Sequence, residues 1–400
     1  MAELFFYLLI LFGIAALMRI DFFFSILYLI VGAVVLSRMW TRRTLENVRI
    51  ERQYQDRAFL GEVIPVSLVV NNGTWLPINW LHLHESLPLN LISPNFHRQV
   101  VSLSPKATEI LSYTLQCRRR GFYKLGPLAM STSDLFGFEE NTATWGHDGT
   151  MIVYPEIVPV QKLGLPSVSP YVSVPSGPRL FEDTSRVSGV RDYTSGDSPR
   201  HINWKTSAAA GKLLVKKYEP AISLDTTIFL DLYEPNYEMR IRYTASELGI
   251  VAAASIANHL TERQQAVGFV SNGLDPLAED QAMPRPLATQ EGQTQLMRIL
   301  DILARVELGD TISLPNLISQ QRPQLSWGAT MLIITCQESD ELLKAIVSAR
   351  HAGFPVVLIL TDTTLPSGPI EQQADTLGVR TYRLRTSEGL KTIFEAKVQM

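Results

Sequence analysis

Two apolar runs at the N-terminus, residues 4–18 and 22–36, constrain the fold most, because neither can lie in water along its whole length. Each makes about 22 Å of helix, which needs flanking residues or a thinned membrane to cross a hydrocarbon core of about 30 Å. Arg19 and Asp21 separate the runs. A single helix would bury both charges near its middle, at about 2.5 to 3.5 kcal/mol each, whereas a hairpin places them at an aqueous turn. The sequence therefore predicts a transmembrane helical hairpin over residues 1–40.

The charges around these runs predict where the rest of the chain lies. A cleaved signal peptide is the alternative to the hairpin, but Glu3 stands where a basic residue is expected, and a second apolar run follows at once. Beyond the second run, arginines crowd the chain from Arg38 to Arg57 and outnumber the acidic residues among them. By the positive-inside rule that side is cytoplasmic. We expect a protein of the cell membrane with most of its chain in the cytoplasm.

Composition narrows the class of protein. A chain of 400 residues, 46% of them hydrophobic, is long and apolar enough for two or three packed domains. A net charge of -3 gives no general attraction to nucleic acid, and no nucleic-acid partner is expected. Cys117 and Cys336 show no CxxC spacing, so neither a disulfide framework nor a zinc site is indicated.

Residues 45–163 carry short alternating apolar segments separated by turn signals, which is typical of an all-β sandwich. His82 and His84 share one face of a predicted strand, but no third metal ligand is near, so a solvent-facing pair is favoured over a metal site. Residues 164–190 are rich in proline, serine and valine at their start, and are predicted to be an extended linker.

The segment 191–219, RDYTSGDSPRHINWKTSAAAGKLLVKKYE, concentrates charged and aromatic residues. Ser198 suits a helix N-cap, Pro199 the first helical position, and Gly211 a C-terminal stop. One short helix over residues 199–210 is predicted.

That helix would bring basic and aromatic side chains onto neighbouring rows. Arg200 and Trp204 are four residues apart, so the guanidinium can stack on the indole, while His201 and Lys205 form the next row. The run LLVKKYE after Gly211 reads as a strand.

Three interpretations of the segment remain open. In the first, a buried ion-pair network pins the helix to the next domain, formed by Arg191, Arg200, Lys212, Lys216 and Lys217 with Asp192 and Asp197. In the second, free N–H groups near Gly196 and Ser198 join Arg191 and Arg200 in an anion site for phosphate or a partner's carboxylate. The third, nucleic-acid stacking on Tyr193 and Trp204, lacks a basic stripe elsewhere in the chain.

Residues 220–400 alternate apolar, β-branched runs with amphipathic helices, which predicts an α/β doubly wound domain. In such sheets ligands lie beyond the carboxyl ends of the strands. The residues at these ends are Asp231, Tyr233, Glu234, Ser271, Asn272, Asp362 and Thr363.

The order R-x-Y-x-x-G-D-x-x-R-x-I-x-W resembles the family called domain of unknown function 58. Its positions here are Arg191, Tyr193, Gly196, Asp197, Arg200, Ile202 and Trp204, followed by Ser207, Ala208 and a strand ending in Glu219. Residues 119–138 resemble the family's upstream stretch, and the likeness extends over nearly the whole chain. The resemblance implies a von Willebrand factor A-like last domain and an association with MoxR-type AAA ATPases or transglutaminase-like membrane proteins.

Many von Willebrand A domains bind Mg²⁺ through D-x-S-x-S at the end of the first strand, because its carboxylate and hydroxyls are hard oxygen ligands. The matching positions here are Asp231, Tyr233 and Pro235. Proline offers no ligand and the tyrosine hydroxyl lies too far out, so the site is degenerate and no metal is predicted. A cation site of another arrangement, formed by Asp231, Glu234 and Asp362, stays open. In the alternative, Asp231 caps the strand end and binds nothing.

Two functional hypotheses follow. The first is a membrane-anchored, cytoplasm-facing, non-enzymatic scaffold or adaptor without cofactors, which binds a partner at the strand-end loops or at Arg191, Tyr193, Gly196, Asp197, Arg200, Trp204 and Lys205. The alternative is a metal-dependent hydrolase or phosphate-handling enzyme using Asp231, Asp362 and an anion site near Arg200. Against the alternative, the chain has no G-x-S-x-G, Walker or HExxH motif.

Overall fold

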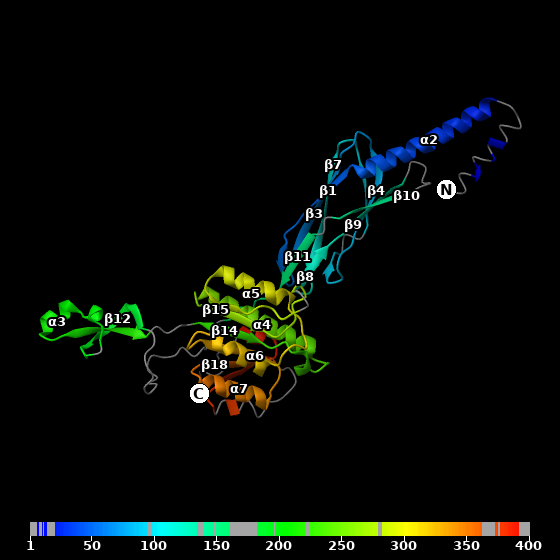
Figure 1. Cartoon of the computed structure of the whole chain (residues 1–400). Helices are drawn as coiled ribbons and strands as arrows, with labels where there is room; N and C mark the ends of the chain where they lie inside the picture. The colour runs from blue at the N-terminus through cyan, green and yellow to red at the C-terminus, as the bar shows by residue number, and fades with distance from the viewer. Residues whose placement is uncertain are drawn as a thin grey trace. The chain divides into compact units, whose positions relative to one another are not determined.

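The structure is a computed structural model (Figure 1) that divides into two compact units, described separately below. Unit 1 comprises residues 1–156 and 300–305, and unit 2 comprises residues 157–299 and 306–400. The residues described are 6–7, 10, 12–13, 21–93, 98–133, 140–146, 149–160, 182–195, 197–220, 225–278, 282–361, 373–374 and 377–391.

Helix α2 (Asp21–Glu46) contains the second apolar run, and its segment Phe24–Glu46 is long and apolar enough to cross a membrane. The helix continues past the predicted boundary at residue 40 because its last turns pack on the sandwich. There Leu45 joins the apolar core, and the Trp40 indole N–H donates to the carbonyl of Pro77 at 3.1 Å.

The first apolar run lies largely outside the described residues. Its described positions 6–7, 10 and 12–13 are helical, and the ring of Phe12 packs edge-on against Phe24 with centroids 6.3 Å apart. An N-terminal apolar helix is therefore present, and the hairpin stays a prediction.

The β-rich domain predicted after the helix is confirmed, with one core enclosed by its sheets. Alternate residues of β3 and β4, among them Leu68, Val70, Leu81 and Leu83, are fully buried, as expected for strands with one face on a core. Hydrogen bonding gives the strand orders β1-β3-β7-β5, β10-β9-β4-β6 and β2-β11-β8. The strands are β1 (Val48–Gln53), β2 (Arg57–Phe59), β3 (Val63–Asn72), β4 (Ile78–Glu85), β5 (Leu91–Ile92), β6 (Gln99–Leu103), β7 (Thr108–Cys117), β8 (Gly121–Leu125), β9 (Leu128–Ser133), β10 (Glu140–Trp145) and β11 (Gly149–Tyr154).

A small hairpin-and-helix module, which we call the signature arm (residues 182–220), follows residues outside the described ranges. It contains β12 (Glu182–Asp192), the 3-10 turn η1 (Pro199–His201), α3 (Trp204–Ala210) and β13 (Leu214–Pro220). β12 and β13 pair antiparallel, with Asp192 opposite Leu214. The predicted linker is thus wrong over residues 182–190, which are strand, because they find a pairing partner more than twenty residues later in the chain; residues 164–181 are not described.

The α/β unit is built on a six-stranded sheet in the order β16-β15-β14-β17-β18-β19. Five strands are parallel and the edge strand β16 is antiparallel. Counted from β14, the order is 3-2-1-4-5-6, which places a topological switch point between β14 and β17. The elements are β14 (Thr226–Leu230), η2 (Glu234–Asn236), α4 (Arg242–Glu262), β15 (Val267–Ser271), β16 (Leu287–Gln290), α5 (Gln293–Arg305), α6 (Leu314–Gln321), η4 (Arg322–Gln324), β17 (Thr330–Thr335), α7 (Asp340–His351), β18 (Val356–Leu360), β19 (Arg380–Arg383) and η5 (Ser387–Lys391).

Helices cover both faces of this sheet. α6 and α7 share a core with Phe229, Ile333 and Leu358. On the other face, Gly249 of α4 lies against Leu230 and Ile334, the neighbours of Phe229 and Ile333 in sequence. Burial on two faces explains why β14, β15, β17 and β18 are apolar without alternation.

Candidate functional site

Asp231 follows β14 at the switch point of the sheet and is fully buried. Its carboxylate accepts four hydrogen bonds from neutral donors. Two come from the loop after β14, namely Tyr233 N at 3.2 Å and Asn236 Nδ2 at 2.9 Å. The others come from neighbouring strands, Asn272 Nδ2 at 2.9 Å and Thr335 Oγ1 at 2.7 Å. The carboxylate therefore joins the carboxyl ends of β15, β14 and β17.

Further hydrogen bonds stiffen this junction. Asn272 accepts from Leu232 N at 2.6 Å through Oδ1, and the buried hydroxyl of Tyr237 donates to the carbonyl of Asp231 at 2.6 Å. Burial, with the nearby Cys336 thiol and Asp231 carboxylate, raises the pKa of Tyr237 well above its usual range. The tyrosine thus stays a neutral donor.

The degenerate adhesion-site positions bring no side-chain ligand to Asp231. Tyr233 approaches through its backbone N–H, Pro235 lies inside η2, and Glu234 pairs with Arg242 at 2.7 Å on the surface. Within the described part of the chain, no three histidine, cysteine or acidic side chains gather into a metal-binding group. Asp362 lies outside the described residues, so its expected role is not tested. The geometry favours Asp231 as a strand-end cap.

Sequence reasoning identified Asn272 but missed Asn236, Tyr237 and Thr335. The pattern that identified Asp231, a polar residue at the end of an apolar strand, is also present at Thr335, which ends the fully buried strand β17. Asn236 and Tyr237 have no such signal, because their contact with Asp231 depends on how η2 turns the chain back.

In the signature arm, Arg191 and Asp197 form a two-pronged ion pair. Arg191 Nη1 and Nη2 reach the two carboxylate oxygens at 2.6 and 2.5 Å, and Thr194 donates its N–H and hydroxyl to Oδ2, both at 2.9 Å. The Arg191 hydrogen bonds, and then the Thr194 N–H, hold the pKa of Asp197 well below its usual range. The carboxylate closes the loop after β12.

The predicted ion-pair network exists in part, but it is not buried. The side chain of Arg191 is 45% exposed and that of Asp197 14%, while the second pair, Lys212 with Asp192 at 2.7 Å, is more exposed still. Surface pairs contribute little to stability. The network orders a loop and does not anchor the arm in a core.

The predicted helix 199–210 is wrong in its first turn. The 3-10 turn η1 ends at His201, Ile202 forms a bridge with Val215, and Asn203 donates its N–H to Leu214 O at 2.9 Å. This strand-like contact interrupts the helix, so Asn203 replaces Ser198 as N-cap and accepts from Thr206 N at 3.4 Å. The predicted stop at Gly211 is confirmed, with a left-handed φ of 65°.

The interruption of the helix removes the geometry expected for two features of the segment, the stacking of Arg200 on Trp204 and the anion site at the helix start. Arg200 and Trp204 no longer share one helix, and no cation–π contact joins them among the described residues. The N–H groups expected to hold an anion precede only a three-residue turn, and the start of α3 is already capped by Asn203. Gly196 lies outside the described residues.

What remains is a set of exposed cationic and apolar side chains on the arm. The Trp204 side chain is 66% exposed and Leu213 48%, and Arg200 and Lys205 are also exposed. Tyr193 is half-buried, and its N–H pairs with Leu213 O at 3.0 Å. We call Arg200, Trp204, Lys205 and Leu213 the arm surface.

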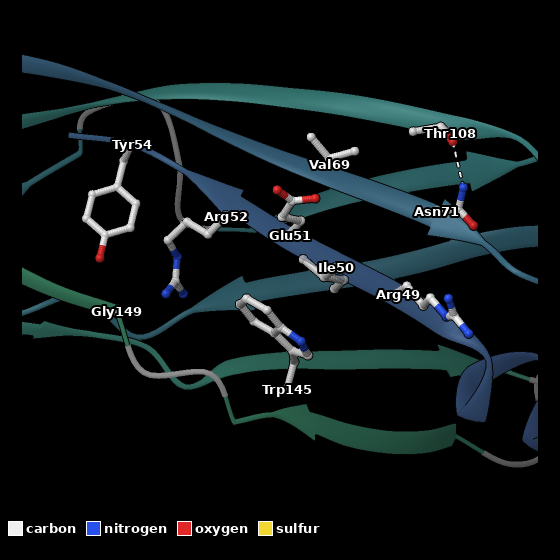
Figure 2. Close-up of a pocket in the computed structure, with 10 residues that line it drawn as sticks. All are labelled: Arg49, Ile50, Glu51, Arg52, Tyr54, Val69, Asn71, Thr108, Trp145 and Gly149. Carbon is white, nitrogen blue, oxygen red and sulfur yellow. Dashed lines mark hydrogen bonds between the residues drawn. The ribbon is translucent and has the colours of Figure 1, made fainter. Parts of the chain in front are cut away.

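The sandwich carries a separate groove of about 650 Å³ beside β1 (Figure 2). Arg52 lies there between Tyr54 and Trp145, with its guanidinium carbon 5.3 Å from the Trp145 ring centroid. It pairs with buried Glu85 at 2.5 Å, and Glu85 also accepts from the Tyr113 hydroxyl. Arg52 is thus committed to the fold, and the other charged side chains that line the groove are the exposed Arg49 and Glu51.

The predicted histidine pair of β4 faces solvent. His82 and His84 are both exposed on the outer face of the strand, at a shallow hollow of about 760 Å³ that Arg98 also lines. Their positions agree with an ordinary polar face.

Residues 189–351 match the family described as Protein of unknown function DUF58. The Bacillus subtilis (strain 168) protein called Uncharacterized protein YeaD is 24% identical over 314 residues, which cover 75% of this chain and 72% of the relative.

Two solved structures are similar to parts of the chain, at low sequence identity and low TM-score. A von Willebrand factor type A protein from Catenulispora acidiphila is 11% identical, with a TM-score of 0.32, over 45% of this chain and 42% of its own. A CARDB domain from Pyrococcus furiosus is 16% identical, with a TM-score of 0.21, over 27% of this chain and 94% of its own.

Proposed function

We propose that this protein, which carries the DUF58 region over residues 189–351, is a membrane-anchored, non-enzymatic scaffold that captures a partner through its arm surface. The observation that carries the proposal is the exposure of Trp204, at 66%, on a module whose own fold is closed by hydrogen bonds. Exposed tryptophan and arginine side chains on an ordered support are the residues that dominate binding energy at protein interfaces.

The fold supplies a stable support for this surface. Ser207 is buried, and its hydroxyl accepts from Leu214 N at 2.9 Å, which fastens α3 to β13. The Arg191–Asp197 pair closes the loop after β12. A partner would therefore meet an ordered surface and would not need to fold it, which lowers the entropic cost of binding.

We further propose that the apolar N-terminal residues form a transmembrane hairpin with the rest of the chain in the cytoplasm. The contact of Phe12 with Phe24 supports the hairpin, and exposed Arg42 and Arg43 at the end of α2 support the orientation. The strand order 3-2-1-4-5-6 supports the proposal that residues 220–400 form a doubly wound, von Willebrand A-like domain.

The partner we propose is a MoxR-type AAA ATPase, or else a transglutaminase-like membrane protein, as the family resemblance implies. Phosphate handling or metal-dependent hydrolysis has less support. Asp231, its main candidate residue, already accepts four hydrogen bonds from protein donors.

Affinity purification of the full-length protein from its native membranes, followed by quantitative mass spectrometry, tests the proposal. We expect an AAA ATPase to be enriched with the wild-type protein, and its recovery to fall roughly tenfold or more in Trp204→Ala and Arg200→Glu. Arg118→Glu, the same charge reversal at an exposed site of the sandwich, is the matched control and should not lower the recovery. Equal recovery with all four proteins would contradict a role for the arm surface.

A further inference from the structure

We propose that the loop between β3 and β4, residues 73–77, is a second membrane contact, which places the Trp75 indole among the lipid headgroups of the bilayer that α2 enters. The inference rests on the membrane anchorage proposed above. It extends that anchorage to the sandwich, where Trp75 is 76% exposed. A tryptophan side chain that is so exposed is available for contacts outside the unit.

The loop is attached to the end of α2 at both of its ends. Gly73 donates its N–H to Asn47 O at 3.3 Å, just after the helix, and Pro77 accepts from the Trp40 indole at 3.1 Å. Trp40 and Asn47 are about 10 Å apart along the helix direction. Trp75 is two residues from Pro77, within about 7 Å of it. It therefore lies near the level of the last two turns of α2.

Hydrogen bonds hold the loop in one shape. Buried Asn72 donates to Leu76 O at 2.8 Å and accepts from the N–H and hydroxyl of Thr74 at 3.0 and 2.8 Å. A Cβ at Gly73 would meet Asn47 O at 2.7 Å, so the loop and the helix end are in close contact. Trp75 is exposed because a fixed loop presents it, and not because the loop lacks contacts.

Along the end of α2 to which the loop is bonded, exposed side chains change from apolar to basic in the order of a bilayer interface. Exposed apolar side chains continue along α2 as far as Met39, and exposed Arg42 and Arg43 follow. Lys106, in the turn between β6 and β7, is exposed and donates to Gly73 O at 2.7 Å. Tryptophan is enriched where hydrocarbon meets headgroups, and basic residues at that level attract anionic lipids.

Fluorophore depth measurements on the full-length protein test the inference. With Cys336→Ser the remaining native cysteine, Cys117, is buried. One further cysteine is then introduced in each variant, by Trp75→Cys, Tyr28→Cys or Leu89→Cys, and is labelled with the fluorophore NBD. Each labelled protein is reconstituted in vesicles of phosphatidylcholine and phosphatidylglycerol. A lipid with a shallow nitroxide is the quencher. Leu89, 95% exposed, is the matched control, because it follows the far end of the eight-residue strand β4, about 26 Å from the loop.

We expect quenching at positions 28 and 75 to be several-fold stronger than at position 89. Strong quenching at 28 with position 75 as weak as 89 would overturn the inference and leave the membrane anchorage standing. Weak quenching at all three positions would overturn the anchorage, and the inference with it.

A second measurement avoids the introduced cysteine. Brominated lipids quench the fluorescence of tryptophans that lie in the membrane. In vesicles that contain them, the wild-type protein should therefore lose a component of tryptophan emission that is absent from Trp75→Phe. Identical quenched components in the two proteins would also overturn the inference.

Discussion

Among the described residues, the donors that hold the buried Asp231 carboxylate are all neutral, and they share its two acceptor oxygens. In Asp231→Asn an amide N–H₂ must face at least one of these donors. We expect the free energy of unfolding to fall by roughly 2 to 4 kcal/mol, since a buried donor loses its acceptor. Chemical denaturation of the full chain in detergent measures the loss.

The control for this prediction is Glu234→Gln, which removes a surface pair with Arg242 and should change stability by less than about 1 kcal/mol. A strand-end cap needs no metal. An unchanged unfolding free energy in Asp231→Asn, together with a rise in the wild-type melting temperature on adding Mg²⁺, would instead indicate a cation site.

His259, buried in α4, predicts a pH dependence of stability. Burial, reinforced by the Arg263 cation, lowers the pKa of His259 below its ordinary value of 6.5. The unfolded chain therefore binds a proton that the folded chain binds poorly. The stabilisation is present above about pH 6.5 and is lost as the pH falls toward the folded pKa. Denaturation midpoints measured between about pH 5 and 7 should decrease toward acid.

His259→Gln removes this titration, so its midpoints should vary less over the same range. His351→Gln, at an exposed histidine of α7, should keep the wild-type slope. A slope unchanged by His259→Gln would assign the pH dependence to other groups.

Within the signature arm, the Arg191–Asp197 pair closes the loop after β12. Asp197→Asn weakens the hold on Thr194 while keeping the shape of the side chain. We expect faster amide hydrogen exchange at residues 193–197, with protection retained in β13 and in the α/β sheet. Hydrogen exchange followed by mass spectrometry measures both regions.

Lys212→Gln, which breaks the more exposed pair with Asp192, is the control and should leave exchange at Thr194 unchanged. If Asp197→Asn instead lowers protection throughout the α/β sheet, the pair is a structural anchor, as the sequence alone suggested.

The proposed transmembrane hairpin predicts which side of the membrane each part of the chain faces. In a Cys336→Ser background, cysteines at positions 2, 20 and 43 report on the N-terminus, the predicted turn and the exposed end of α2. A hairpin with a cytoplasmic body exposes only position 20 to a membrane-impermeant maleimide added outside cells, because the charges of Arg19 and Asp21 favour the aqueous turn. Positions 2 and 43 should react after permeabilisation.

Labelling of positions 2 and 20 from outside would show a single span in place of the hairpin. Labelling of position 43 from outside would reverse the orientation.

Local patterns in the sequence predict part of this fold correctly. Apolar runs and alternation identified the N-terminal helix, the β-rich domain and the buried strands of the α/β sheet, and the motif around Arg191 identified the DUF58 region, which its match over residues 189–351 confirms. These features depend on periodicity and on neighbours along the chain. The edge strand β16 and the eight-residue α6 were missed because short elements carry little periodic signal.

The remaining features depend on contacts between residues that are distant in sequence. β12 is a strand because β13 pairs with it, and the predicted helix breaks where Ile202 and Asn203 contact β13. Asp231 became a cap because donors more than a hundred residues apart along the chain, at Tyr233 and Thr335, meet at one carboxylate. Trp75 gained its place beside α2 in the same way, through two hydrogen bonds that no local pattern encodes.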